Sequence, residues 1–303
     1  MHMNSEIHLE NQEAIVGKIA LEILSANNQA IIWGITSSGV FLNLRPSIIF
    51  LTNSEHLGPV NIISNQPIPT QWKKDDTLTI SLMDEYLNLD HDKTPLSLKI
   101  KEIWQTAIRP IANISANEQH NRMMASAQQL SLLKNDQGFA PLLLPFLSDS
   151  MVSDTDNSWL FSSWNTITLL KIALFQNDME SFLSMATLLV GSGRGLTPSG
   201  DDLLTGFTFM RRRWFPEADW MSDAENQLLT TFKQKTTAIS STLYECALQR
   251  ETDARIQEMS DVLMNDNIPF HEQAIRLARW GNSSGADIFL GMLLAIRCFQ
   301  VNP

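Results

Sequence analysis

The chain has 303 residues, of which 44% are hydrophobic, so it is long enough to bury one large or two modest cores. Its 33 acidic and 22 basic residues give a formal net charge of −11, which excludes a general binder of nucleic-acid backbones or anionic membranes. Cys246 and Cys298 lack the spacing of a disulfide framework, and no signal-peptide pattern or transmembrane-length apolar run occurs, so we expect a cytoplasmic protein.

Residues 1–95 are predicted to contain one helix followed by a small β-rich unit. Apolar residues at helix-like intervals predict an amphipathic helix from Glu6 to about Ala26. Short runs rich in β-branched residues then alternate with turn residues, which is typical of a mostly antiparallel unit over residues 30–90. The predicted strands are Ala30–Trp33, Val40–Leu44, Ser47–Leu51, Val60–Ile63 and Thr77–Leu82.

Residues 96–303 are predicted to form a larger α-helical domain, so the expected fold class is α+β. After Pro95, the apolar residues from Leu96 to Ile111 recur at helix-like spacing. Two prolines bracket Leu142–Leu144, which we interpret as a linker between halves, and Ser148–Asn157 resembles an acidic surface loop. The other predicted helices are Asn117–Leu133, Ser158–Phe175, Asp178–Val190, Gly200–Trp214, Asp223–Gln249, Asp253–Met264, Phe270–Trp280 and one that ends near Phe299.

The segment Gly191–Asp202, with the sequence GSGRGLTPSGDD, is the most informative motif. Its closely spaced glycines predict a tight, exposed loop, because glycine permits positive φ angles and close approach of a ligand. The loop leads into a helix whose N–H groups and dipole favour a bound anion. Arg194 is either a charged fork for phosphate or carboxylate or merely a solvated cation.

A second helix start repeats the pattern, since Ser199–Gly206 and Ser284–Gly291 both read Ser-Gly-x-Asp-apolar-x-x-Gly. The serines are predicted to cap the two helices, with Asp202 and Asp287 completing capping boxes. A glycine inside a helix costs about 1 kcal/mol relative to alanine. Either the helices cross closely at these glycines, or a ligand lies over that face.

Other stretches are less specific. The hydroxyl-rich run Lys235–Thr242 either lines a polar pocket or lets helices pack closely. Arg211–Arg213 are better explained by the dipole at a helix end than by phosphate binding. The glycine loop lacks the ending of a Walker loop and follows no predicted strand, and no His/Cys cluster has zinc spacing.

Together, Gly191–Asp202 and the later segment Gly281–Asp287 (GNSSGAD) resemble a bacterial family long catalogued as a domain of unknown function. That family is now associated with the third subunit of oxamate carbamoyltransferase. The resemblance implies an enzyme of allantoin and purine-nitrogen breakdown, which converts oxalurate and phosphate into oxamate and carbamoyl phosphate. It also implies that three different subunits act together.

This chemistry suits the motif, because the substrates and products are small anions. Asp201 and Asp202 are the expected catalytic residues, which would orient or deprotonate the carbamoyl nitrogen. The residues expected to bind the substrate are Gly193, Arg194, Gly195, Thr197, Ser199, Gly200, Ser284, Gly285 and Asp287. No cofactor is certain, although a divalent cation such as Mg²⁺ is compatible with the aspartates. The expected partners are a small anionic metabolite and other enzyme subunits, and neither nucleic acid nor a membrane is expected to bind. The alternative function is that of a non-catalytic anion-binding or sensor subunit.

Overall fold

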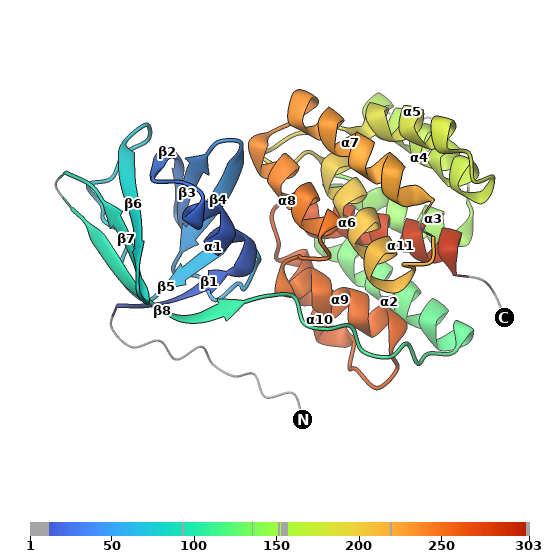
Figure 1. Cartoon of the computed structure of the whole chain (residues 1–303). Coiled ribbons are helices and arrows are strands. Elements are labelled where there is room, and N and C mark those ends of the chain that lie inside the picture. Colours follow the sequence, from blue (N-terminus) through green and yellow to red (C-terminus); the bar gives the residue numbers. More distant parts are fainter. Residues whose placement is uncertain are drawn as a thin grey trace. The chain divides into compact units, whose positions relative to one another are not determined.

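The computed structural model describes residues 12–300, except residues 93, 135, 151, 153–156 and 219. The chain divides into two compact units, Met1–Thr106 and Ala107–Pro303. The first unit is rich in strands and the second is helical, which confirms the predicted α+β class (Figure 1). Residues 6–11 of the first predicted helix, and part of the predicted acidic loop 148–157, lie outside the described residues.

Eight strands of the first unit form a closed barrel in the order β1-β5-β4-β3-β2-β6-β7-β8. Two neighbouring pairs, β1–β8 and β4–β5, are parallel, and the other pairs are antiparallel. The mostly antiparallel arrangement was therefore predicted, but the closure into a barrel was not. The strands are β1 Glu13–Gly17, β2 Gln29–Thr36, β3 Gly39–Leu44, β4 Ser47–Thr52, β5 Asn61–Ser64, β6 Thr77–Met83, β7 Tyr86–Asp90 and β8 Leu96–Trp104.

The barrel interior is filled by apolar side chains that alternate along the strands. In β3, Val40, Leu42 and Leu44 are buried, as expected when every second residue of a strand faces the core. The helix α1 (Lys18–Ser25) adds Ala20 and Leu24 to the same core. The helix predicted from Glu6 is therefore correct over α1 but wrong over β1.

The segment Leu96–Trp104 is strand β8, so the helix predicted over Leu96–Ile111 is wrong. Leu96 and Leu98 are buried while Ser97 and Lys99 are exposed, which is the two-residue period of a strand. Pairing with both β1 and β7 satisfies the backbone of β8 and closes the barrel.

The second unit contains ten α-helices and one short 3₁₀ helix among the described residues. The predicted linker Leu142–Leu144 is instead part of η1 and α3, with Leu142 and Leu143 buried in the helical core. The predicted long helix Asp223–Gln249 is divided at Thr236 and Thr237 into α7 and α8. The elements are α2 Ala116–Lys134, η1 Ala140–Leu142, α3 Leu143–Ser148, α4 Ser158–Phe175, α5 Met179–Leu189, α6 Ser199–Trp214, α7 Met221–Lys235, α8 Ala238–Leu248, α9 Ala254–Met264, α10 His271–Ala278 and α11 Ser284–Phe299.

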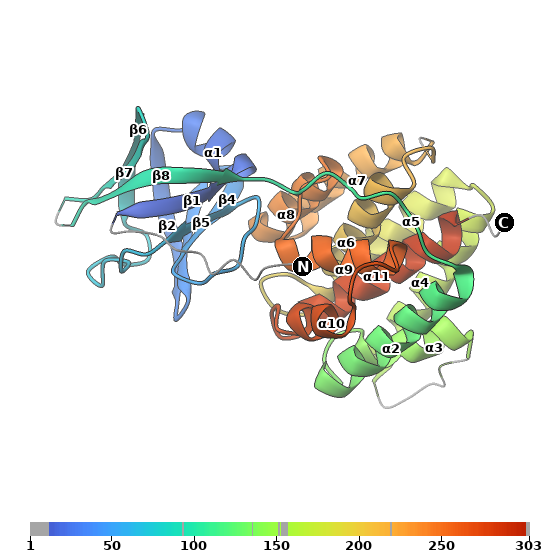
Figure 2. The same ribbon diagram turned by 90° about the horizontal axis from the view of Figure 1, so that it is seen from below.

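Helices α6 and α11 run side by side through the middle of the helical unit (Figure 2). Nearly every residue of α6, and the first thirteen residues of α11, are buried. Because of this burial, the two helices that carry the repeated motif are the central pair of this unit.

Among the described helices, none combines the length and apolar character needed to span a membrane.

Candidate active site

The repeated glycines let α6 and α11 cross with their backbones in contact. A Cβ atom added to Gly206 would lie 2.2 Å from the carbonyl oxygen of Ile288, and one added to Gly291 would lie 1.9 Å from that of Leu203. These contacts are reciprocal, because Leu203 and Ile288 occupy the same position in the repeat. The structure thus confirms the close crossing of the two helices at these glycines.

Both helices begin at the serine of the motif, but neither serine caps its own helix. The N-cap residues are Pro198 and Ser283, and neither makes a side-chain capping bond. The predicted capping boxes are therefore wrong. The hydroxyl groups instead act across the crossing, where Ser199 lowers the pKa of Asp287 and Ser284 lowers the pKa of Asp202. The repeated serines and aspartates thus connect the start of one helix to the start of the other.

The segment before α6 is an exposed loop with unusual backbone angles, as predicted. Gly191, Gly193 and Gly195 have φ angles of 77°, 117° and 101°, which favour glycine. Residues 193–196 are exposed, whereas Pro198 and Ser199 are buried. A Cβ atom at Gly193 would lie 2.7 Å from the amide nitrogen of Ser199, so the loop packs directly on the start of α6.

The loop is fixed to the rest of the unit by three hydrogen bonds that involve hydroxyl groups. Thr237 donates to the carbonyl oxygen of Leu196 (2.6 Å), and Thr197 Oγ1 lies 3.0 Å from Ser284 Oγ. Ser192 accepts a bond from the indole of Trp159 at 3.0 Å. The interruption between α7 and α8 therefore has a local role, since Thr237 also caps α8 by accepting from the amide of Ser240.

Gly200 and Gly285, both expected to bind the substrate, have amides that are already engaged. The Gly200 amide donates to the Ser192 carbonyl at 2.9 Å, and the Gly285 amide donates to the Trp280 carbonyl at 3.2 Å. Each glycine also allows a preceding helix to approach closely, because an added Cβ would lie 2.0 Å from the carbonyl oxygen of Leu189 or Leu277, respectively. In this conformation neither amide is available to an anion.

Asp201, one of the two expected catalytic residues, is buried and holds the loop. Its Oδ1 accepts from the Gly191 amide at 2.7 Å, and its Oδ2 accepts from the Thr236 hydroxyl. Burial raises the pKa of Asp201, while the bonds from Thr236, Gly191 and Ser240 oppose that rise. These contacts suit a residue that positions the loop through hydrogen bonds.

Asp202 and Asp287 are buried and lie near each other beneath the loop. Their exposed fractions are 2% and 0%, and each has an Oδ2 atom with no hydrogen-bond partner among the described residues. The hydroxyl groups of Ser284 and Thr197 lower the pKa of Asp202, and those of Ser283 and Ser199 lower the pKa of Asp287. Because buried polar atoms are usually paired, these two oxygens require an explanation beyond the packing of the two helices.

The electrostatic environment disfavours the ionised forms of both carboxyl groups. Burial raises the pKa of Asp287 to about 6, against a bond from the Phe139 amide and the charge of Lys134. Burial, with repulsion from Asp287, raises the pKa of Asp202 well above its usual range. A proton is thus held at this site more strongly than on exposed aspartates.

The raised pKa of Asp287 predicts how stability depends on pH. Between about pH 4 and pH 6 the folded state keeps a proton that the unfolded state releases, so the free energy of unfolding should fall as pH rises. Each unit of pKa difference corresponds to about 1.4 kcal/mol. Chemical denaturation across this range should show a smaller fall in the Asp287→Asn variant. Asp178 has the opposite pH dependence, because hydrogen bonds from Ser181 lower its pKa. Its contribution to the free energy of unfolding is therefore lost as pH falls.

The loop, both helix starts and the aspartates Asp201, Asp202 and Asp287 lie within residues 189–296. This segment matches the family model of the oxamate carbamoyltransferase subunit AllH. The match confirms the resemblance indicated by the two motifs. No solved structure matches the chain.

Several residues that complete the site precede the AllH-matching segment and were not predicted. The Phe139 amide donates to Asp287 Oδ1 at 2.6 Å, and the Phe139 ring stacks on Trp159 with ring centroids 5.3 Å apart. A Cβ atom at Gly138 would lie 2.5 Å from the same carboxylate oxygen. Lys134 donates to the carbonyl oxygen of Gly281 at 2.9 Å. Gly138, in the turn between α2 and η1, was the available signal, but nothing in the sequence relates it to Asp287.

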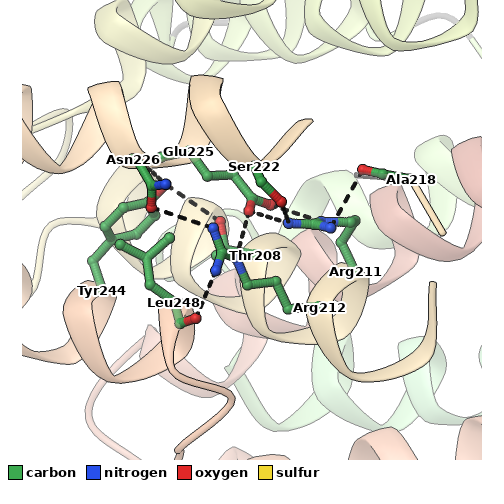
Figure 3. A network of polar contacts seen from close by, with 9 residues as sticks. All are labelled: Thr208, Arg211, Arg212, Ala218, Ser222, Glu225, Asn226, Tyr244 and Leu248. Atoms are coloured by element: carbon green, nitrogen blue, oxygen red, sulfur yellow. Dashed lines mark hydrogen bonds and ion pairs between the residues drawn. The ribbon is translucent and has the colours of Figure 1, made fainter. Parts of the chain in front are cut away.

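Arg211, Arg212 and Arg213, at the end of α6, form ion pairs with carboxylates of the protein. Figure 3 shows Arg211 and Arg212 converging on Glu225, at 2.9 Å from Arg211 Nε to Oε1 and 2.6 Å from Arg212 Nε to Oε2. Arg213 makes a two-point contact with Asp261 at 2.9 and 3.0 Å. These buried ion pairs account for the arginine run without a phosphate.

Two features of the described residues bear on the expected ligands. Arg194 is exposed and has no ion-pair partner there, so its guanidinium is available to an anion. No group of three or more His, Cys, Asp or Glu side chains within the described part of the chain is arranged to hold a metal ion.

Proposed function

We propose that this chain is a subunit of a carbamoyltransferase that interconverts oxalurate plus phosphate with oxamate plus carbamoyl phosphate. The observation that carries the proposal is the arrangement of the AllH-matching segment. An exposed glycine loop bearing an unpaired arginine packs on the joined starts of α6 and α11, above two buried carboxyl groups that retain unpartnered oxygens.

The anion binds on the loop side of this arrangement. Gly193, Arg194 and Gly195 are exposed, and backbone N–H groups in a turn of positive φ angles form a concave surface suited to phosphate or carboxylate. The Arg194 guanidinium adds a charge-assisted fork. Because the amides of Gly200 and Gly285 are engaged, the loop and not the helix starts supplies the donors.

The buried side of the arrangement acts on the uncharged part of the substrate. Oxalurate carries its carboxylate at one end and a carbamoyl group at the other. If the charged end is held by the loop, the carbamoyl group is directed toward Ser199, Ser284 and the two carboxyl groups below them. Asp201 keeps the loop in position through Gly191 and Thr236.

Replacing the loop cation should weaken substrate binding more than it slows turnover. Arg194→Ala removes a charge-assisted contact worth about 1.5–3 kcal/mol, so we expect KM to rise roughly 10- to 150-fold with a smaller change in kcat. Lys233→Ala, which removes another exposed cation of the helical unit, is the control and should leave KM unchanged. An unchanged KM in Arg194→Ala would remove this residue from the site.

The proposal is tested by reconstituting the chain with its partner subunits and measuring release of oxamate from oxalurate in the presence of phosphate. Activity that requires this chain supports the function. Binding of oxamate or carbamoyl phosphate in calorimetry, with equal turnover in the absence of this chain, would identify a non-catalytic sensor subunit instead.

A further inference from the structure

The Asp202–Asp287 pair presents a problem of charge. Two ionised carboxylates, 2% and 0% exposed and close enough to repel each other, are unstable without a neutralising partner. The hydroxyl groups of Ser199, Ser283, Ser284 and Thr197 lower the two pKa values but carry no charge. The unpartnered Oδ2 atoms therefore mark where the missing partner lies.

The charged groups around the pair do not supply that partner. Lys134 acts on Asp287 from the end of α2, but its ammonium group donates to the Gly281 carbonyl. Asp201, which directly precedes Asp202 in the first turn of α6, adds a further negative charge that acts on Asp202. Three acidic groups thus face one lysine, and a proton is the simplest species that restores the balance.

We infer that Asp202 and Asp287 together retain one proton on their unpartnered oxygens and exchange it with the substrate during carbamoyl transfer. The inference rests on the proposed function for its chemistry, whereas the shared proton itself rests on the burial of the pair and on its unpartnered oxygens. It assigns proton transfer to one aspartate from each helix, and it leaves Asp201 as a positioning residue.

The proton balance of the reaction suits such a pair. A phosphate oxygen attacks the carbamoyl carbon of oxalurate, the bond from that carbon to the inner nitrogen breaks, and its electron pair stays on nitrogen. That nitrogen must gain a proton to leave as the amide of oxamate, while the attacking hydrogen phosphate must lose one. A pair that gives its proton to nitrogen and takes one from phosphate ends the cycle in its starting state.

The contacts of the two carboxyl groups differ, and this difference decides which of them carries the proton. Asp287 accepts from the Phe139 amide and is near Lys134, both of which favour the ionised form. For Asp202, the groups that favour the ionised form are the uncharged hydroxyls of Ser284 and Thr197, and repulsion from Asp287 and Asp201 opposes it. Asp202 is therefore the proton donor to nitrogen, and Asp287 is the carboxylate beside it.

Access to the pair requires movement of the loop. Gly193 packs on Ser199, and Thr197 bonds to Ser284, so loop residues lie between solvent and both hydroxyl groups that touch the acids. Glycines in the left-handed region give this loop backbone freedom that other residues lack. Such a movement breaks the contacts of Gly193 with Ser199 and of Thr197 with Ser284, and new contacts between Arg194 and a bound anion would compensate for their loss.

The shared proton is tested on the full chain alone by ¹³C NMR titration of its aspartate carboxyl groups. We expect the pair to lose its protons in two separated steps, as coupled acids do. In Asp287→Asn, the pKa of Asp202 should fall, because the repulsion from the Asp287 carboxylate is gone. Asp178→Asn is the control and should leave the pair unchanged. Independent titration of both groups near pH 4, or an unchanged pKa of Asp202 in Asp287→Asn, would overturn the inference.

The same variants separate the inference from the function on which it rests. If the pair titrates as expected but the reconstituted wild-type enzyme releases no oxamate from oxalurate, the proposed function fails and the shared proton stands. If oxamate is released while the two carboxyl groups titrate independently, the shared proton fails and the function stands.

Discussion

Gly291→Ala is expected to destabilise the helical unit by about 2–3 kcal/mol, although alanine is the better helix former by about 1 kcal/mol. The added methyl group would lie 1.9 Å from the carbonyl oxygen of Leu203 and 2.7 Å from the amide of Phe207. Both atoms belong to the backbone of α6, so the clash is relieved only if the two helices separate. Urea denaturation followed by the far-ultraviolet signal of the helical unit measures the effect.

Two further glycine variants make this result specific to the crossing. Gly206→Ala should behave like Gly291→Ala, because its added methyl group would lie 2.2 Å from the Ile288 carbonyl. Gly34→Ala in the barrel meets only a side chain at 4.0 Å and should leave the helical unit unchanged. A stabilised Gly291→Ala would show that the helices do not touch there.

Asp202→Asn and Asp287→Asn should each lower kcat of the reconstituted enzyme about 10²- to 10⁴-fold, which is the range for loss of a general acid or base. Asparagine keeps the size and some of the hydrogen bonds of aspartate but cannot carry the proton. Since the two groups act as one unit, the double variant should be scarcely slower than either single variant.

The control for this effect is Asp178→Asn, which changes an exposed cap of α5 into another good capping residue. Its kcat should equal that of the wild type. Multiplicative losses in the double variant would indicate that Asp202 and Asp287 act separately, and full activity in Asp202→Asn would exclude it as the donor.

The sequence was most informative where local chemistry decides the structure. Runs rich in β-branched residues between turn residues predicted β2 to β6, and the helices that flank the glycine loop were placed within a few residues of their observed bounds. The β8 strand was missed, because leucines at positions 96 and 98 with isoleucines further on fit both a two-residue and a helical period. Pairing with β1 and β7, which the sequence does not display, settles the choice.

The candidate site shows the same limit. The repeat of Ser-Gly-x-Asp predicted that two helix starts are related, and the glycines allowed a close crossing to be considered. The serines were assigned to local caps because the capping box explains such spacing within one helix. Only the packing of α6 against α11 places Ser199 on Asp287 and Ser284 on Asp202.

Long-range partners were beyond sequence reasoning for a further reason. Lys134 ends α2 and Phe139 lies in the turn after it, and neither belongs to a recognisable motif. Their effect on Asp287 depends on how η1 and α11 pack. Thr236 and Thr237 were singled out as poor helix formers, but their bonds to Asp201 and Leu196 depend on the fold. Motifs located the site, and tertiary contacts determined which groups face each other.

The most direct test of the proposed site is to follow the backbone amides of the full chain by ¹H–¹⁵N NMR while oxamate is added. We expect the largest shifts at Gly193, Arg194 and Gly195, with smaller shifts at Ser199 and Ser284 and none in the barrel. Shifts confined to residues away from the loop, or saturable binding unaltered in Arg194→Ala, would contradict the assignment of this loop as the substrate site.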